Sequence, residues 1–389
     1  MRVLFLTHSF PRYVGDTAGA FILRLATALA NEDVAVKVIA PAASSTPSHD
    51  MLDGVPITRF RYAPRAMETL AYQGNMATQV KESWGAKLGL VGLLGAELQA
   101  ALGETGREKY DLLHAHWWFP NGVAATAASR WRGLPLVTTL HGSDVRLGRA
   151  IKPARPAMRA VLRRSNRVTA VSRWLAEEAQ QVSGGEMPIV APMPVATDVF
   201  RPDPMQSRTD ALLFVGRLTR QKGIDLLLRA LAILPSNVTL DVVGDGEERS
   251  ALDVLASSLG IRERVRWHGA KAATDLAPYY RGAAALVVPS SEEGLGLVAV
   301  EAQLCETPVI AFASGGVVDV ISDGESGLLV RERTPEALAQ AITRLRANPD
   351  HGTSLARTGA TRARERFSPD HVARRYADIY RDAIGSAAH

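Results

Sequence analysis

The segment ALLFVGRLTRQKGIDLLLRALAIL, residues 211–234, shows the pattern that repeats along this chain. Its first residues, Ala211–Val215, are apolar without alternation, as expected of a strand covered on both faces of a parallel sheet. A loop with glycines at 216 and 223 follows, and Ile224–Leu234 then carries apolar residues at helical spacing. A strand, a short loop and a helix are the repeating unit of a doubly wound α/β fold.

The same alternation extends in both directions. In the first half we expect strands at Arg2–Thr7, Val34–Ala40, Val55–Phe60, Asp111–Ala115, Pro135–Leu140, Arg167–Val171 and Pro188–Ala191. In the second half we expect strands at Val238–Val243, Val265–His268, Ala284–Val288 and Pro308–Phe312, with helices at Gly19–Ala30, Leu295–Cys305 and Thr334–Arg346. Prolines crowd residues 191–210 and mark a linker. The sequence therefore predicts two Rossmann-like domains, residues 1–200 and 201–367, followed by a C-terminal helix within 368–389.

Composition excludes several classes of protein. The 389 residues are 47% hydrophobic and 22% charged, which is ordinary for a globular protein and unlike a disordered or fibrous chain. The longest strongly apolar run, Leu88–Ala96, is about half of a bilayer span, so we expect no membrane-crossing helix. The single cysteine, Cys305, excludes internal disulfides and cysteine zinc clusters and favours a reducing cytoplasm.

Basic residues are concentrated in one segment. Nine lie between Arg146 and Arg173, which contains no acidic residue. Arg155, Arg159, Arg163 and Arg167 are spaced by four, so a helix would align them on one face, and with Arg164 they form the candidate patch. Two interpretations stay open: a solvated helix face, or a patch that attracts an anionic membrane or an acidic acceptor. Nucleic acid is disfavoured because no aromatic residues interleave with the arginines.

Ligands of parallel sheets bind beyond the carboxyl ends of strands, so the loops there are informative. Gly15 follows the first strand and can bring backbone amides to an anion, or it belongs to a plain loop. His141 follows the strand ending at Leu140 and is either a ligand contact or structural. Arg217 and Lys222 suit a diphosphate near a helix start, although a solvated charged loop is the simpler alternative.

Two further loops carry glycines. The run with Gly244 and Gly246 resembles a dinucleotide fingerprint, but Arg249 takes the place of the third glycine, so we interpret it as a tight turn. Glu293 and Glu301 flank a predicted helix start with seven residues between them, a pair suited to sugar or ribose hydroxyls. As bare chemistry this segment also fits an ordinary surface helix.

Taken in order, these motifs resemble the retaining nucleotide-sugar glycosyltransferases of family 4, which have the GT-B fold. The likeness covers nearly the whole chain and is strongest from 211 to 330. Its first part rests on Ser9-Phe10-Pro11, His114-Ala115-His116 and His141-Gly142-Ser143-Asp144. Its second part rests on Val215–Leu218, Lys222-Gly223, Glu293–Leu297, Glu301-Ala302, Thr307–Ala311, Gly315-Gly316, Asp323-Gly324 and Gly327–Val330.

The resemblance implies two Rossmann-like domains facing a central cleft, the first binding the acceptor and the second the nucleotide sugar. The implied catalytic residues are His141, Arg217, Lys222 and Glu293. Arg217 and Lys222 would hold the diphosphate, Glu301 the ribose, and His141 and Glu293 the transferred sugar. The other implied donor contacts are Gly15, Gly244, Gly246, Gly269, Gly294, Leu295, Gly296 and Leu297. The terminal helix would cross back onto the first domain.

The implied reaction moves a sugar from a nucleoside diphosphate, UDP first and GDP next, to a hydroxyl of a lipid, glycan or small molecule. The sugar would keep its anomeric configuration. The sequence contains no Asp-x-Asp motif, and we expect no metal and no other cofactor. The expected location is the cytoplasm, with contact at the inner face of the plasma membrane.

Several features leave alternatives open. Gly15 and Gly19 are separated where many family members have adjacent glycines, and Leu295 and Gln221 replace the commoner Phe and Glu. The rival functions are a non-hydrolysing nucleotide-sugar epimerase, a nicotinamide dehydrogenase and a non-catalytic nucleotide-sugar-binding protein.

Overall fold

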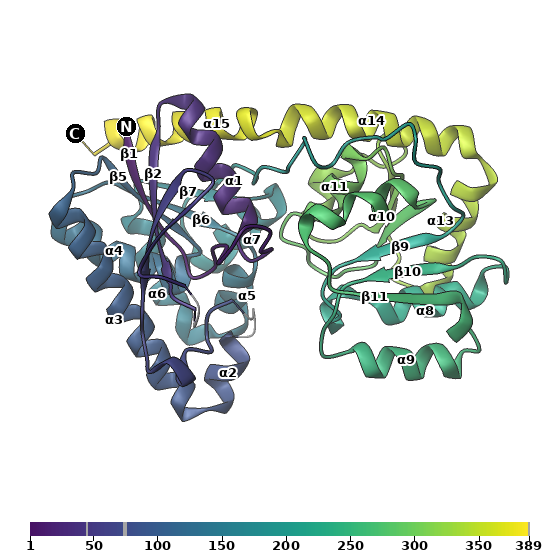
Figure 1. The fold of residues 1–389 in the computed structure, drawn as a ribbon, viewed down its shortest axis with the longest axis horizontal. Helices are drawn as coiled ribbons and strands as arrows, with labels where there is room; N and C mark the ends of the chain where they lie inside the picture. Colours follow the sequence, from purple (N-terminus) through teal and green to yellow (C-terminus); the bar gives the residue numbers. More distant parts are fainter. Residues whose placement is uncertain (44–45, 73–75, 388–389) are drawn as a thin grey trace. The chain divides into compact units, whose positions relative to one another are not determined.

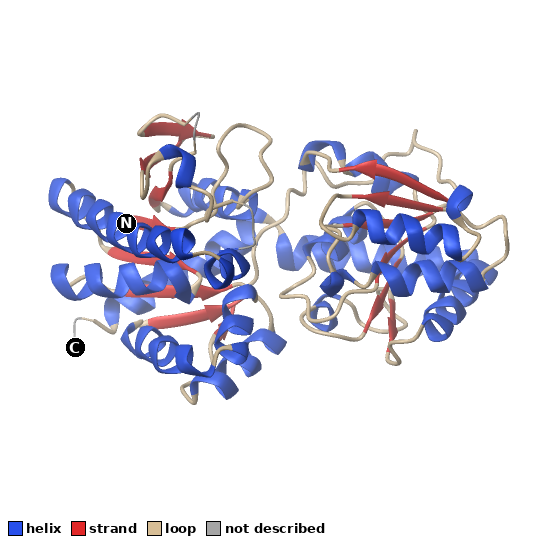
Figure 2. Ribbon diagram, turned by 90° about the horizontal axis from the view of Figure 1, so that it is seen from below, coloured by secondary structure: helices blue, strands red, loops and turns tan. Residues whose placement is uncertain are grey.

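The computed structural model describes residues 1–43, 46–72 and 76–387. The chain forms two compact units, Met1–Pro194 with Pro369–His389, and Val195–Ser368. In each unit helices cover both faces of a largely parallel sheet, as Figure 2 shows. The expected class, α/β with two Rossmann-like domains, is confirmed.

The first boundary lies six residues earlier than the sequence predicted, because residues 195–200 bond to the second unit. The Val195 amide donates to the Phe367 carbonyl at 2.9 Å. The Phe200 ring packs edge-on against Tyr280, with 5.7 Å between centroids. These contacts explain why the proline-rich segment ends the first unit at Pro194.

The first sheet has the order β3-β4-β2-β1-β5-β6-β7-β8. Its strands are β1 (Arg2–Leu6), β2 (Ala35–Pro41), β3 (His49–Leu52), β4 (Val55–Phe60), β5 (Leu112–His116), β6 (Leu136–Leu140), β7 (Arg167–Ala170) and β8 (Ile189–Val190). Its helices are α1 (Ala20–Ala28), α2 (Met76–Glu82), α3 (Trp84–Arg107), α4 (Val123–Arg132), α5 (Ser143–Ala150), α6 (Arg155–Arg164), α7 (Arg173–Ser183) and α15 (Pro369–Gly385). The strand order reverses at β1 and β5, so their carboxyl ends form the switch point of this unit.

Strand β3 is a feature that the sequence analysis missed. It runs antiparallel to β4, with Leu52 opposite Val55. The two-residue turn between them has positive φ at both Asp53 and Gly54, 48° and 78°. An Asp-Gly pair is a favoured hairpin turn because both central positions need that backbone region.

The second sheet has the order β11-β10-β9-β12-β13-β14, the Rossmann arrangement that reverses between β9 and β12. Its strands are β9 (Leu212–Val215), β10 (Leu240–Val243), β11 (Val265–Gly269), β12 (Ala285–Val288), β13 (Val309–Phe312) and β14 (Leu328–Val330). Its helices are α8 (Ile224–Ile233), α9 (Arg249–Ser258), α10 (Ala277–Gly282), α11 (Leu297–Leu304), α12 (Val317–Val320), α13 (Pro335–Ala347) and α14 (Pro349–Phe367).

Two expectations for this unit need correction. Strand β14 was not predicted, because three residues are too short for a periodicity signal. Helix α11 begins at Leu297 rather than near Leu295, because Gly296 has a φ of 88°, outside the helical region.

The terminal helix α15 belongs to the first unit (Figure 1). It contacts α1 and β6 and buries Tyr376 and Tyr380 completely. The Tyr380 hydroxyl and His114 Nδ1 lie 2.8 Å apart. The last helix is therefore packed against α1 and β6 rather than lying free at the surface.

Helix α3 bears on the expectation that no helix crosses a membrane. Among the described residues it is the single helix that is long and apolar enough, by length and composition alone, to cross a membrane. The apolar run was cut short in the sequence by Glu97, which the fold buries. Leu93, Glu97, Ala101 and Glu104 form its buried side within the first unit.

Candidate functional site

Two loops meet at the switch point of the second sheet. One follows β9 and spans residues 216–223, and the other follows β12 and spans residues 289–296. The Gln221 side-chain amide donates to the Glu292 carbonyl at 3.0 Å and ties the loops together. Gln221, which departs from the commoner family residue, therefore has a structural role here.

The charged residues of these loops differ in their partners. Lys222 Nζ lies 2.6 Å from Glu293 Oε1, so the expected phosphate ligand is ion-paired with the expected sugar ligand. Arg217 is exposed, and within the described part of the chain its side chain makes no hydrogen bond or ion pair. The ammonium of Lys222 has three donors and keeps capacity for an anion beside Glu293. All the guanidinium donors of Arg217 are available to an anion.

The loop after β13 fixes the backbone of Glu293. The Gly316 amide donates to the Glu293 carbonyl at 2.7 Å. A Cβ atom at Gly315 would lie 2.5 Å from the Glu293 backbone, so only glycine fits there. The loops after the neighbouring strands β9, β12 and β13 thus meet at Glu293. Leu295 is buried, and Gly296 precedes α11 without a side-chain cap.

Glu301 lies within α11, and Tyr280 of α10 determines its orientation. The Tyr280 hydroxyl donates to Glu301 Oε2 at 2.7 Å. Burial raises the pKa of Tyr280 well above its usual value, so the phenol stays protonated and donates. No motif in the sequence pointed to Tyr280, because the pair is separated by a strand and a loop.

The predicted donor contacts Gly244, Gly246 and Gly269 lie where loops of the second unit pack against each other. A Cβ atom at Gly244 would lie 1.9 Å from the Gly216 carbonyl oxygen, and one at Gly246 would lie 2.5 Å from the Leu218 oxygen. The Gly244 amide donates to the Gly269 carbonyl at 2.9 Å. These three residues therefore bring the loops after β9, β10 and β11 together, which agrees with the tight-turn interpretation.

An aromatic side chain lies beside these glycines. The Arg249 guanidinium stacks over the Trp267 ring at 4.0 Å from its centroid. The indole Nε1 of Trp267 is buried without a hydrogen-bond partner in the described structure. Trp267 lies on β11, which ends at Gly269, one of the donor contacts that the resemblance implies.

In the first unit, four ring side chains gather at the carboxyl ends of β1, β5 and β6. His116 Nδ1 lies 3.1 Å from His141 Nε2. The Trp117 ring lies 4.3 Å from that of His141 and 4.5 Å from that of His8. Burial lowers the pKa of His8 to about 4 and those of His116 and His141 well below the usual value. The cluster is therefore uncharged near neutral pH, and its rings act through hydrogen bonds.

Asp144 holds the turn that carries His141. Its Oδ1 accepts from the amides of His141 and Gly142, at 3.2 and 3.0 Å, and its Oδ2 accepts from Trp118 at 3.1 Å. Burial raises the pKa of Asp144, although four backbone amides act against that rise. The sequence placed Asp144 in the motif but gave it no role. His116, Trp117 and His8 were likewise missed as neighbours of His141.

The loop after β1 behaves differently at its two glycines. A Cβ atom at Gly19 would lie 2.1 Å from the Ser9 carbonyl oxygen, so Gly19 is closely packed. Gly15 is exposed, has a φ of 90°, and has open space where a Cβ would stand. An ion pair of 2.6 Å between Arg12 and Asp16 shapes the turn between them. Of the two glycines of this loop, Gly15 is therefore the one whose backbone has room for a ligand nearby.

The five arginines of the candidate patch do not form one helix face. Helix α6 ends at Arg164, and Arg167 opens β7, where it forms a two-pronged ion pair with Asp382. Arg155 donates to the Gly148 carbonyl at 3.2 Å. The alignment expected from the spacing of four is therefore wrong for Arg167, because the helix stops before it.

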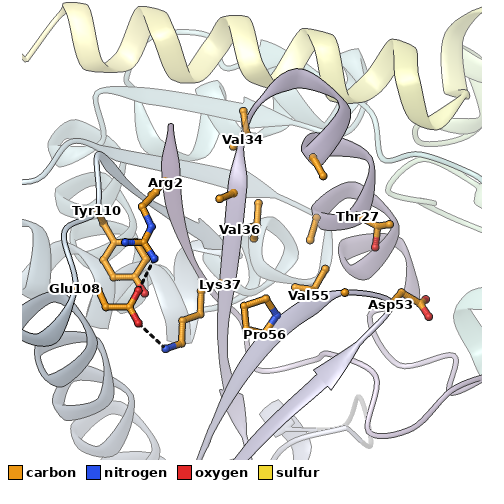
Figure 3. Close-up of a pocket in the computed structure, with 14 residues that line it drawn as sticks. Arg2, Thr27, Val34, Val36, Lys37, Asp53, Val55, Pro56, Glu108 and Tyr110 are labelled. Carbon is orange, nitrogen blue, oxygen red and sulfur yellow. Dashed lines mark hydrogen bonds and ion pairs between the residues drawn. The ribbon is translucent and has the colours of Figure 1, made fainter.

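Two features of the described residues bear on metal and ligand sites. No group of three or more His, Cys, Asp or Glu side chains is placed to hold a metal ion within the described ranges. A hollow of about 450 Å³ lies at the amino ends of β1, β2 and β4, and Figure 3 draws the side chains that line it. Glu108 there pairs with both Arg2 and Lys37, at 2.6 and 3.6 Å. The charges of that hollow are mutually neutralised.

The comparisons with known proteins decide the family. Residues 17–196 match the model "Glycosyl transferase 4-like domain", and residues 198–363 match "Glycosyl transferases group 1". A D-inositol 3-phosphate glycosyltransferase of Frankia alni is 38% identical over 73% of this chain and 78% of that protein. One from Xylanimonas cellulosilytica is 31% identical over 95% of this chain and 93% of that protein. The chain is a GT-B glycosyltransferase of family GT4.

Solved structures agree with this family. A sucrose-phosphate synthase from Thermosynechococcus elongatus superposes with a TM-score of 0.82 and 26% identity over 98% of each chain. The Anabaena protein HepE, solved with UDP-glucose, gives a TM-score of 0.75 at 22% identity over 97% of this chain and 99% of that one. The GT-B fold and the family 4 resemblance are thus confirmed. Because this chain belongs to family GT4, it is a glycosyltransferase enzyme. This disfavours the three alternatives, an epimerase, a dehydrogenase and a non-catalytic binding protein.

Proposed function

We propose that this GT4 enzyme takes its sugar from a nucleoside diphosphate sugar, with UDP as the first candidate, and keeps the anomeric configuration. The observation that carries the proposal is the cluster at the switch point of the second unit, where Arg217, Lys222, Glu293 and Glu301 lie on loops or helices following β9 and β12. The UDP-glucose complex of HepE, a protein of the same fold, supports UDP.

Each side chain of the cluster has a distinct task in this proposal. Arg217, free of other partners in the described structure, binds the leaving diphosphate, and Lys222 adds a second cation. Negative charge grows on that diphosphate as the sugar departs, so cations already in place stabilise the transition state. Glu301, oriented by Tyr280, accepts hydrogen bonds from the ribose hydroxyls.

Glu293 orients the transferred sugar in this proposal rather than attacking it. Its carboxylate is ion-paired with Lys222 and its backbone is held by the loop after β13. We infer a front-face route in which the departing phosphate takes the acceptor proton. A trapped glycosyl-enzyme at Glu293 would contradict this assignment. The contact of His141 with the sugar stays a prediction.

For the acceptor we propose an inositol phosphate, bound by the first unit. The support is that relatives over 30% identical across nearly the full chain carry the name D-inositol 3-phosphate glycosyltransferase. The ring cluster of His8, Trp117 and His141 offers uncharged donors and acceptors and flat faces that suit a polyhydroxylated ring.

We further propose that the reaction needs no metal and takes place in the cytoplasm. The proposed location rests on the lone buried Cys305, since a free thiol is typical of a reducing compartment.

Nucleotide binding tests the donor part of the proposal. A ligand at 100 times its dissociation constant stabilises a protein by roughly 2.7 kcal/mol. We expect UDP, among UDP, GDP, ADP and NAD, to raise the melting temperature most. Glu301→Ala and Tyr280→Phe should both weaken that rise, since one removes the ribose acceptor and the other its orienting hydroxyl.

The matched control is Glu325→Ala, whose exposed carboxylate lies in the same unit and pairs with Arg362. Stabilisation by UDP that is equal in Glu301→Ala and Glu325→Ala would remove the ribose assignment. Stabilisation by NAD alone would contradict the donor class.

A further inference from the structure

A second cavity of about 570 Å³ lies in the first unit, away from the ring cluster. Its walls come from α6, from the loop that leads into β7 and from the loop that leads into β8. These loops precede the strands, whereas the ring cluster follows the carboxyl ends of β1, β5 and β6. The cavity therefore lies at the opposite edge of the sheet from the acceptor groups proposed above.

Arginine side chains dominate the charge of this cavity. Arg159, Arg163 and Arg167 line it together with a single carboxylate, Glu186. Arg167 is engaged by Asp382 outside the lining. Arg159 and Arg163 thus contribute positive charge against Glu186 alone, and the cavity is net basic.

The two uncompensated arginines differ in how firmly they are placed. Arg159 Nε donates to the Ser183 carbonyl at 2.6 Å, which fixes the side chain, while its terminal nitrogens make no hydrogen bond or ion pair with the residues that the structure describes. Arg163, four residues later on α6, makes no hydrogen bond or ion pair within the described residues. Residues four apart lie on the same helix face, so both guanidinium groups serve one side of the cavity.

Guanidinium groups bind phosphate through two parallel hydrogen bonds, a geometry that lysine cannot reproduce. Apolar side chains of Leu162, Val168 and Ile189 line part of the wall, where they can contact the uncharged part of a small molecule. The volume falls within the range of about 300–1,000 Å³ that is usual for small-molecule sites. A flat solvated helix face has no such enclosure.

We propose that this cavity is a second anion site, in which Arg159 and Arg163 bind the phosphate group of a ligand that is neither donor nor acceptor. Its position at the amino ends of β7 and β8 separates it from the reacting groups of this unit by the length of a strand, roughly 13 Å for four residues. The proposal does not depend on the identity of the acceptor or the nucleotide.

Calorimetric titration with inorganic pyrophosphate tests the site, after the donor site has been filled with saturating UDP. We expect Arg163→Gln to weaken pyrophosphate binding roughly tenfold or more, as expected for loss of a charged hydrogen bond. Arg159→Gln should act in the same direction. Because the Arg163 side chain is exposed and makes no hydrogen bond or ion pair within the described structure, its replacement should leave folding intact, which an unchanged melting temperature would verify.

Arg164→Gln is the matched control, since Arg164 is the next residue of α6 and does not line the cavity. Sedimentation with phosphatidylglycerol vesicles, compared with phosphatidylcholine vesicles, distinguishes a lipid headgroup from a soluble phosphate. Arg163-dependent binding of pyrophosphate assigns a soluble ligand, and Arg163-dependent sedimentation alone assigns a headgroup. Equal behaviour of Arg163→Gln and Arg164→Gln in both experiments would overturn the site.

Discussion

Arg217→Ala should lower kcat for sugar transfer by about 10²–10³, the loss seen when one preorganised group that stabilises a developing oxyanion is removed. The reason is that Arg217 has no other partner in the described structure, so its whole guanidinium is available to the departing diphosphate. Release of nucleoside diphosphate from a saturating donor measures the effect. Arg217→Lys should recover only part of the rate, because an ammonium keeps the charge but cannot form the two parallel hydrogen bonds of a guanidinium.

Arg220→Ala is the control for this change. Arg220 is exposed, lies three residues further along the same loop, and also has no side-chain partner in the described structure. Its replacement alters the loop's charge equally but should leave kcat near that of the unmodified enzyme. Both variants should unfold at the same denaturant concentration as the parent, since surface substitutions usually change stability by less than about 0.5 kcal/mol. Equal rates in the two variants would remove Arg217 from the catalytic assignment.

Glu97→Gln should stabilise the enzyme, by an amount that grows with pH. Glu97 lies on the buried side of α3, and neither carboxylate oxygen has a hydrogen-bond partner in the described structure. Burial raises the pKa of Glu97 from 4.5 to about 8. Between these values the folded chain keeps a proton that the unfolded chain releases, so the free energy of unfolding falls as pH rises.

The expected gain from Glu97→Gln is on the order of 3 kcal/mol at pH 7 and much smaller near pH 5. Glutamine is nearly isosteric and does not ionise, so it removes the pH-dependent cost and retains a polar group in the same place. Urea unfolding of both proteins between pH 5 and 8 measures the difference. Glu82→Gln, at the exposed end of α2, should show no such trend. A difference that does not change with pH would show that Glu97 is not protonated in the fold.

The sequence predicted those parts of the fold and site that depend on local pattern. Apolar runs and glycine loops correctly gave the two sheets, and strand ends pointed to Arg217, Glu293 and His141. The Asp53-Gly54 turn also carries a local signal for the β3–β4 hairpin, so β3 could have been predicted from the sequence.

Contacts between distant segments had no such signal. The ion pair of Lys222 with Glu293 joins residues 71 positions apart, and the hydrogen bond of Tyr280 to Glu301 joins two helices across a strand. The basic segment is the clearest example, since its spacing of four predicted one face. The end of α6 at Arg164 instead places Arg167 beside Asp382 of the terminal helix. The spacing of the arginines does not show where the helix ends, so it could not predict that Arg167 lies outside α6.

Transfer itself is the most direct test of the central claim. The purified enzyme would be incubated with UDP-, GDP- or ADP-sugars and D-inositol 3-phosphate, with and without EDTA, and the product's anomeric carbon followed by NMR. We predict one glycosylated product, formed fastest from a UDP-sugar, unaffected by EDTA and with the anomeric configuration of the donor. An inverted product, or donor conversion in the absence of any acceptor, would contradict the account.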